Sequence, residues 1–86
     1  MKPDRVTAEA AVKTAWQEVL NRDDFGAEEN FFDLGGSSLS LMRLQIRLAE
    51  LLGTEIPLVE LYGSGSIAGT VELIMALSEG ESDGQD

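Results

Sequence analysis

The sequence predicts an all-α fold, a small four-helix bundle of three long helices and one short helix. Three stretches carry apolar residues at intervals of three and four, the spacing that places them on one face of a helix. Residues that commonly end helices stand between these stretches, at Asn21, Gly53 and Pro57. With 86 residues, 43% of them hydrophobic, and no Cys, the chain is expected to form one small domain without disulfides.

The first helix is predicted to follow a disordered lead-in of residues 1–6. Thr7 is suited to cap its N-terminus, and Glu9 suits the positive end of the helix dipole. The inward face is formed by apolar residues at helical spacing, namely Val12, Ala15, Trp16, Val19 and Leu20. Asn21 then ends the helix, and the folded domain is expected to span residues 7–78.

A long connection, residues 22–36, follows this helix. Loops of such length in a compact domain are commonly functional or held down by their own apolar residues. This loop contains Phe25, Phe31, Phe32 and Leu34. Because aromatic side chains bury a large area, we expect the pair Phe31 and Phe32 to anchor the loop in the core rather than to contact a partner.

The second helix, predicted over residues 39–52, carries two apolar stripes. The core stripe contains Leu41, Leu44, Leu48, Leu51 and Leu52, and the second stripe contains Leu39, Met42, Ile46 and Ala49. A domain this small cannot bury a helix on every side, so Leu39 and Met42 are expected to be exposed and Ile46 to be covered by the short third helix. Arg43 and Arg47 fall between the stripes and are expected to be solvated.

Two more helices complete the predicted bundle. Gly53 ends the second helix, Pro57 keeps the preceding residue extended, and a short helix follows over residues 58–62. Ser66 is suited to cap a last helix that ends near Ser78. Its apolar residues are Ile67, Val71, Ile74, Met75 and Leu77. Residues 79–86 are polar and acidic, which predicts a disordered tail.

The composition argues against several functions. The chain has neither His, the usual base that activates a serine, nor Cys, so we expect no catalytic residues in it. The acidic residues lack the spacing of a calcium loop, and we expect no metal site. A net charge of −10 disfavours nucleic acid and anionic membranes, and no apolar run reaches membrane-spanning length. A cytoplasmic monomer is expected.

One segment combines paired glycines, a serine and the start of a helix, and it reads Phe31-Phe32-Asp33-Leu34-Gly35-Gly36-Ser37-Ser38-Leu39. The first turn of a helix has unpaired N–H groups and a partial positive charge that favour an anion. The glycines let the backbone turn sharply and let another molecule come close. A serine hydroxyl at this place is suited to carry a phosphate.

The stretch from Asp33 to Leu39 resembles the phosphopantetheine attachment motif of carrier proteins, which in its peptidyl form is Asp-Leu-Gly-Gly-(His/Asp)-Ser-Leu. The resemblance places the attachment residue at Ser38, and Ser37 then occupies the His/Asp position. Residues 56–62 resemble the short third helix of the same family and residues 66–71 the start of its last helix, so the similarity extends over roughly residues 6–78.

This resemblance implies a non-catalytic peptidyl carrier of nonribosomal peptide biosynthesis. A phosphopantetheinyl transferase would attach 4'-phosphopantetheine from coenzyme A to Ser38 as a phosphodiester, and the thiol of this arm would hold an aminoacyl group as a thioester. The other implied partners are an adenylation enzyme and condensation, tailoring or thioesterase enzymes. The surface expected to meet them consists of Leu39, Met42, Arg43, Ile46, Leu58 and Tyr62.

Two alternatives stay open. An acyl or aryl carrier of polyketide or hybrid biosynthesis is the nearer one, because Ser37 is neither the His common in peptidyl carriers nor the Asp common in acyl carriers. The double Phe and the paired Gly favour the peptidyl form. The other alternative is a helical interaction domain without a prosthetic group, in which Gly-Gly-Ser-Ser is an ordinary flexible loop.

Overall fold

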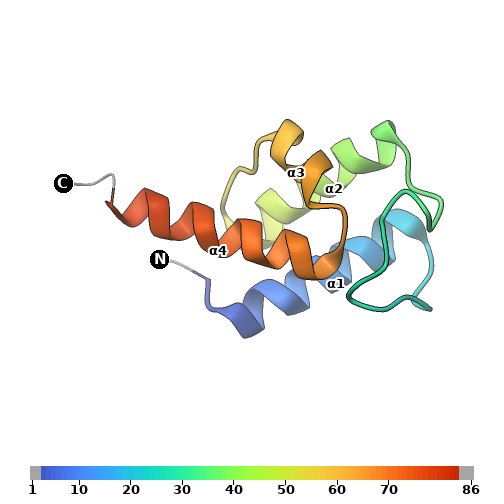
Figure 1. Ribbon diagram of the computed structural model, residues 1–86, viewed down its shortest axis with the longest axis horizontal. Coiled ribbons are helices and arrows are strands. Elements are labelled where there is room, and N and C mark those ends of the chain that lie inside the picture. The colour runs from blue at the N-terminus through green and yellow to red at the C-terminus, as the bar shows by residue number, and fades with distance from the viewer. Residues whose placement is uncertain (1–2, 84–86) are drawn as a thin grey trace.

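The computed structural model describes residues 3–83, with side chains through Ser78, and confirms the all-α fold. The described residues form four helices, which are labelled in Figure 1. They are α1 (Arg5–Leu20), α2 (Ser38–Leu52), α3 (Leu58–Ser64) and α4 (Ile67–Asp83). As predicted, three helices are long and α3 is short. In the described part of the chain, no helix has the length and apolar character needed to cross a membrane.

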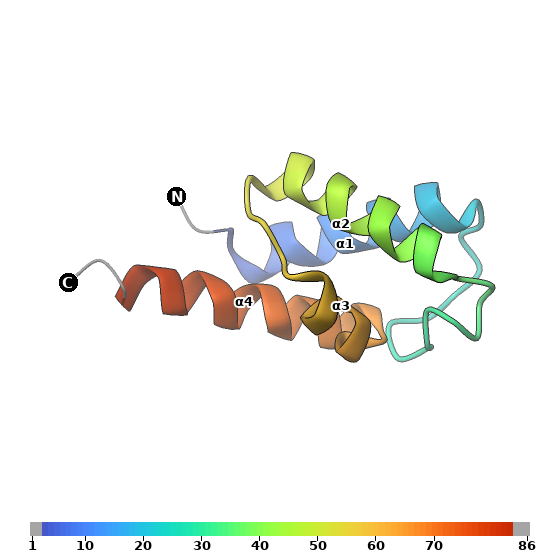
Figure 2. The same ribbon diagram turned by 90° about the horizontal axis from the view of Figure 1, so that it is seen from above.

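The helices are arranged so that the start of α2 lies at one end of the molecule. α1 packs against both α2 and α4, while α3 bridges α2 and α4 from the other side. Figures 1 and 2 show α1 beginning and α4 ending at the opposite end from the 22–36 loop and the first turn of α2. The loop therefore presents the glycine-serine segment far from both ends of the described chain.

The core is formed by apolar residues from all four helices and from the loop. Trp16 is 1% exposed, and its ring lies 5.4 Å from that of Phe25 and 5.3 Å from that of Phe31. Phe31 is fully buried, as predicted for a loop anchor. Phe32 is half-buried and its ring lies 5.2 Å from that of Tyr62, so it links the loop to α3.

The first helix begins earlier than predicted. Asp4, not Thr7, is the N-cap, and its Oδ1 accepts a hydrogen bond from the Thr7 backbone N–H at 2.7 Å. This bond lowers the pKa of Asp4, since it favours the charged carboxylate. Arg5 and Val6 are thus helical, and only residues 1–2 of the expected lead-in lie outside the described residues. Asn21 ends α1 in the left-handed conformation, at φ 57°.

The second helix confirms most of its predicted faces, with two corrections. Leu41, Leu44 and Leu48 are buried, but the last turn presents Leu52 rather than Leu51 to the core. The prediction that α3 covers Ile46 is wrong, because this side chain is 58% exposed. α3 lies closer to the start of α2, over the stretch that contains Ser38. Gly53 ends α2 as predicted, at φ 65°.

The last two helices are longer than predicted. α3 continues to Ser64, and α4 does not end near Ser78 but continues to Asp83. Once a helix is nucleated, each added residue gains a backbone hydrogen bond, which explains how polar residues can extend it. Of the tail expected to be disordered, residues 79–83 are therefore helical, and residues 84–86 lie outside the described residues. The predicted cap is present, as Ser66 Oγ accepts from the Gly69 N–H at 3.0 Å.

Candidate functional site

Two adjacent serines at the mouth of α2 have different environments. Ser37 is the N-cap, and its Oγ accepts from the Ser40 N–H at 3.2 Å and lies 3.1 Å from Ser40 Oγ. Ser38 is the first helical residue and is exposed. Its Oγ has no hydrogen-bond partner among the described residues. The hydroxyl of Ser37 is thus used to hold the helix terminus, and that of Ser38 is free to react.

The paired glycines before these serines meet two different requirements. Gly35 has φ 102°, a left-handed conformation that strains any residue with a Cβ. Gly36 lies so close to Phe31 that a Cβ would clash with the Phe31 ring and carbonyl oxygen. The buried Phe31 ring therefore sits directly beneath the turn that leads to Ser38. This contact explains why a glycine pair and an aromatic residue occur together in the segment.

The rest of the loop is tied down by hydrogen bonds that sequence reasoning did not identify. The Phe31 N–H donates to Gly65 O at 2.7 Å, and the Ala68 N–H donates to Ala27 O at 3.0 Å, so the loop is joined to the α3–α4 turn. Asn30 Oδ1 accepts from the Phe32 N–H at 2.8 Å. These contacts fix the loop on which the serines depend.

An arginine joins the end of α1 to the same loop. Arg22 forms an ion pair with Asp24 at 2.6 Å, and its Nη1 donates to Leu34 O at 3.1 Å. The guanidinium group lowers the pKa of Asp24, mainly through the hydrogen bond between the two side chains. Leu34 is half-buried against the core, whereas Asp33 is exposed. Arg22 was not singled out by its sequence pattern, since its partner is a backbone oxygen distant in sequence.

An apolar surface surrounds Ser38. The residues that line a hollow of about 220 Å³ beside it are Ser38, Leu41, Met42, Leu58, Val59 and Tyr62. Met42 is 46% exposed and Val59 is 84% exposed, and Leu39 and Tyr62 are exposed as well. Val59 was not among the residues predicted for this surface, although Leu58 and Tyr62 of the same helix were.

The arginines of α2 differ in their partners. Arg47 forms ion pairs with Glu18 of α1 at 2.6 Å and with Glu50 at 3.2 Å, and its hydrogen bond to Glu18 lowers the pKa of that carboxyl. Arg43 is exposed and has no ion pair within the described residues. In the same part of the chain, no group of three or more acidic side chains is placed to hold a metal ion.

The fold and site define a class, a small helical domain that presents one unengaged serine hydroxyl at a helix N-terminus beside an apolar hollow. Residues 10–74 match the family described as phosphopantetheine attachment site, and the chain belongs to this family. Its members are carriers that hold 4'-phosphopantetheine covalently. The hydroxyl of Ser38 is exposed and a hollow lies beside it, so the site has room for such a group.

The chain is also similar to segments of much longer synthetases. It is 37% identical over 76 residues to a polyketide synthase-nonribosomal peptide synthetase of Aspergillus clavatus, covering 83% of this chain and 2% of that protein. It is 32% identical over 81 residues to a linear gramicidin synthase subunit of Brevibacillus parabrevis, and this match covers 94% of this chain and 2% of that protein. It is 33% identical over 75 residues to a plipastatin synthase subunit of Bacillus subtilis, and this match covers 87% of this chain and 3% of that protein. The chain thus spans only a few per cent of these relatives.

Proposed function

We propose that this chain is a peptidyl carrier whose 4'-phosphopantetheine arm is attached to Ser38. The observation that carries the proposal is the division between the two serines: Ser37 is engaged as the cap of α2, while Ser38 Oγ is exposed and unengaged. When bound, the arm supplies a thiol that holds an acyl group as a thioester. The chain itself has no His or Cys and is proposed to be a substrate of other enzymes rather than an enzyme.

The attachment reaction needs a partner that supplies the base. Ser38 Oγ would displace the nucleotide portion of coenzyme A, so that a new P–O bond forms to the serine as the pyrophosphate P–O bond breaks. The proton of Ser38 must leave, and no His in this chain can take it. We therefore assign the base to a phosphopantetheinyl transferase. The unpaired N–H groups at the start of α2 favour the negative charge that remains at Ser38.

The peptidyl form is proposed over the acyl or aryl form. Two of the relatives named above are a gramicidin synthase and a plipastatin synthase, and the third combines polyketide and peptide synthesis in its name. The neutral Ser37 supports neither form by itself. An adenylation enzyme would load the thiol, and condensation, tailoring or thioesterase enzymes would receive the cargo. A cytoplasmic location stays a prediction of the sequence.

The surface proposed to meet these partners begins beside Ser38 and extends along α2 and α3. It contains the predicted residues Leu39, Met42, Arg43, Ile46, Leu58 and Tyr62, to which the structure adds Val59. All of them are exposed, so a partner that reaches Ser38 can contact them without unfolding the domain. Arg43, with no ion pair among the described residues, is available to pair with an acidic group of a partner.

Intact-mass analysis after incubation with coenzyme A and a promiscuous phosphopantetheinyl transferase tests the attachment. The parent protein is expected to gain one arm, and Ser38→Ala to gain none. Ser37→Ala is the matched control: it removes the cap and should reduce stability by about 1 kcal/mol while still accepting the arm. If Ser38→Ala still gains the arm, or if a folded Ser37→Ala gains none, the assignment of Ser38 is wrong.

A further inference from the structure

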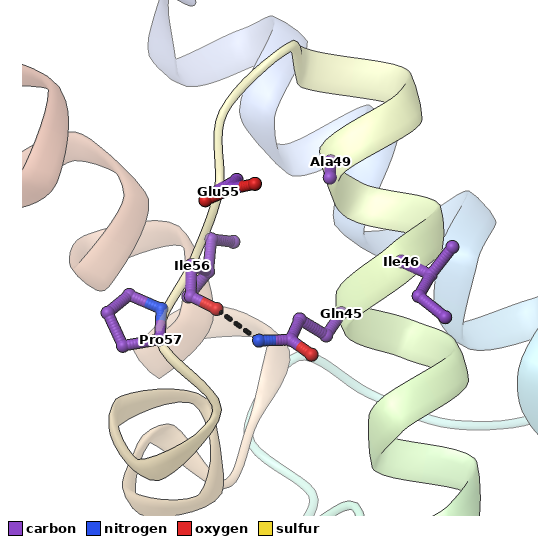
Figure 3. A pocket seen from close by; sticks show the side chains of 6 residues that line it. All are labelled: Gln45, Ile46, Ala49, Glu55, Ile56 and Pro57. Atoms are coloured by element: carbon purple, nitrogen blue, oxygen red, sulfur yellow. Dashed lines mark hydrogen bonds between the residues drawn. The ribbon is translucent and has the colours of Figure 1, made fainter.

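One face of α2 connects Ser38 to a second hollow farther along the helix. At about 100° per residue, Ser38, Met42, Gln45 and Ala49 fall within roughly 60° of one another. The first part of this face borders the hollow beside Ser38. The second part borders a larger hollow of about 380 Å³, between α2 and the connection to α3. Its lining residues, shown in Figure 3, are Gln45, Ile46, Ala49, Glu55, Ile56 and Pro57.

This second hollow combines apolar walls with unpaired oxygen atoms. Gln45 Nε2 donates to Ile56 O at 2.7 Å, which ties the connection to α2 and leaves Gln45 Oε1 without a donor among the described residues. The Glu55 carboxylate is exposed and has no ion pair in the described part of the chain. No basic residue lines the hollow, and Ile46 and Ala49 give it an apolar side. Its chemistry fits a ligand with an ammonium group and a small apolar side chain.

The hollow lies within reach of an arm attached to Ser38. With a rise of 1.5 Å per residue, Gln45 and Ala49 lie roughly 10 and 16 Å from Ser38 along the helix axis. The main chain of 4'-phosphopantetheine, from the phosphate to the thiol, extends to roughly 18 Å at standard bond lengths. An extended arm on Ser38 is therefore long enough to reach the part of α2 that lines this hollow together with Glu55.

We propose that this hollow, here named the Glu55 hollow, holds the aminoacyl group carried on the arm of Ser38. The Glu55 carboxylate and Gln45 Oε1 accept hydrogen bonds from the α-ammonium group of the cargo, while Ile46 and Ala49 contact its side chain. The inference rests on the proposed function of Ser38. It adds a preference that the attachment site alone does not provide, because an acyl group without an amino group has no charge to pair with Glu55.

The test compares two cargoes that differ only in the amino group. Alanyl and propionyl groups, each joined through a stable amide to amino-coenzyme A, are transferred to ¹⁵N-labelled protein, and intact mass verifies the loading. Amide chemical shifts are then compared at about pH 6.5, where an α-ammonium group is charged. We expect the alanyl form to shift the amides of Gln45, Ala49, Glu55 and Ile56, and the propionyl form to leave them close to those of the protein with the arm alone.

The variants Glu55→Gln and Glu60→Gln separate the ion pair from general charge. Both remove one exposed carboxylate near α3, but Glu60 does not line the hollow. Loss of one exposed ion pair should reduce the alanyl-specific shifts by roughly two- to fivefold in Glu55→Gln, and Glu60→Gln should retain them. Retention of the full shifts in Glu55→Gln would overturn the role of that carboxylate.

The outcomes distinguish this inference from the function on which it rests. Absence of any mass gain on the parent protein refutes the attachment to Ser38 and the inference with it. A normal mass gain with identical spectra for the two cargoes, or with alanyl-specific shifts only outside the Glu55 hollow, refutes the inference and leaves the attachment intact. The comparison of cargoes on the parent protein needs no variant, so a variant that fails to fold cannot obscure the result.

Discussion

At the scale of single residues, the site depends on side chains that are absent as much as on those present. Gly35 takes a left-handed backbone conformation, and Gly36 makes room for the ring of Phe31. Ser37 uses its hydroxyl within α2, so that only Ser38 of this pair offers an unengaged oxygen. A substitution therefore acts differently at each position: through backbone strain at Gly35, through a steric clash at Gly36 and through loss of the helix cap at Ser37.

Gly36→Ala is expected to destabilise the domain by about 1 to 3 kcal/mol, because its Cβ would overlap the buried Phe31 ring and force one of them to move. Gly63→Ala is the matched control. Gly63 lies in α3, and a Cβ at this position would have no neighbour within 4 Å, so alanine there should be neutral or stabilise the helix by up to about 1 kcal/mol. Urea denaturation followed by circular dichroism compares the two, and equal midpoints would contradict the close packing at Gly36.

Trp16→Ala is expected to lower the free energy of unfolding by about 3 to 5 kcal/mol, a large share of the stability of a small domain. Trp16 is buried and in contact with the rings of Phe25 and Phe31, so its loss also loosens the loop that carries the serines. Denaturation followed by far-ultraviolet circular dichroism measures the change without relying on Trp fluorescence. A midpoint close to that of the parent would refute the structural role of this ring.

At the scale of the elements, helical spacing predicted which helix faces are apolar. It did not predict which neighbouring helix covers each face or where each helix begins. Leu44 and Leu48 are buried as expected, because apolar residues at helical spacing show which face of the helix packs against the core. Ile46 was expected under α3, yet the hydrogen bond from Gln45 to Ile56 O, which holds the connection before α3 against α2, is not revealed by any periodicity. The start of α1 was misplaced because Asp4 and Thr7 are both suitable caps, and only the geometry of the first turn chooses between them.

The attachment segment could be predicted from sequence more completely than its surroundings. The motif pointed to Ser38 as the attachment residue, which stays a prediction, and the structure adds that Ser37 is the N-cap of α2. The hydrogen bond from Phe31 to Gly65 and the contact of Arg22 with Leu34 join residues distant in sequence, so they could not be predicted without the fold. The Glu55 hollow could not be predicted without the fold either, because it forms between α2 and the connection from α2 to α3.

Met42→Glu is expected to leave the helical signal and the melting temperature nearly unchanged while slowing arm attachment or cargo loading about tenfold. Met42 is half exposed and lines the hollow beside Ser38, and an apolar anchor of an interface is commonly worth about 2 kcal/mol. A charge placed there must be desolvated when the partner binds. Time-resolved intact-mass analysis with the transferase measures the rate.

Val6→Glu is the control for this variant, because Val6 is also an exposed apolar residue but lies on α1, away from Ser38. It should react at the parent rate. Unfolding of Met42→Glu would show that Met42 belongs to the core. A folded Met42→Glu that reacts at the parent rate would place the contact surface elsewhere, with residues 58–62 as the next region to test.

At the scale of the whole molecule, the excess of negative charge destabilises the folded state through repulsion. The chain has 16 acidic and 6 basic residues, and three of the arginines are held in ion pairs with Glu72, Asp24, Glu18 and Glu50. In each of these pairs both side chains are at least 37% exposed, so the pairs contribute little to stability. Repulsion among the remaining carboxylates acts across a domain only 23 × 20 Å in cross-section.

The melting temperature is therefore expected to rise with salt rather than fall. Between about 0.01 and 0.1 M NaCl the Debye length falls from about 30 to about 10 Å, which screens repulsion across the molecule before it screens contacts within an ion pair.

At the lower salt concentration, Glu28→Gln should raise the melting temperature, because Glu28 is exposed and has no ion pair among the described residues. Glu18→Gln should lower it or leave it unchanged, because it also removes the partner of Arg47. Thermal melts by circular dichroism measure all three effects, and a parent protein that melts lower at the higher salt concentration would show that the ion pairs outweigh the repulsion.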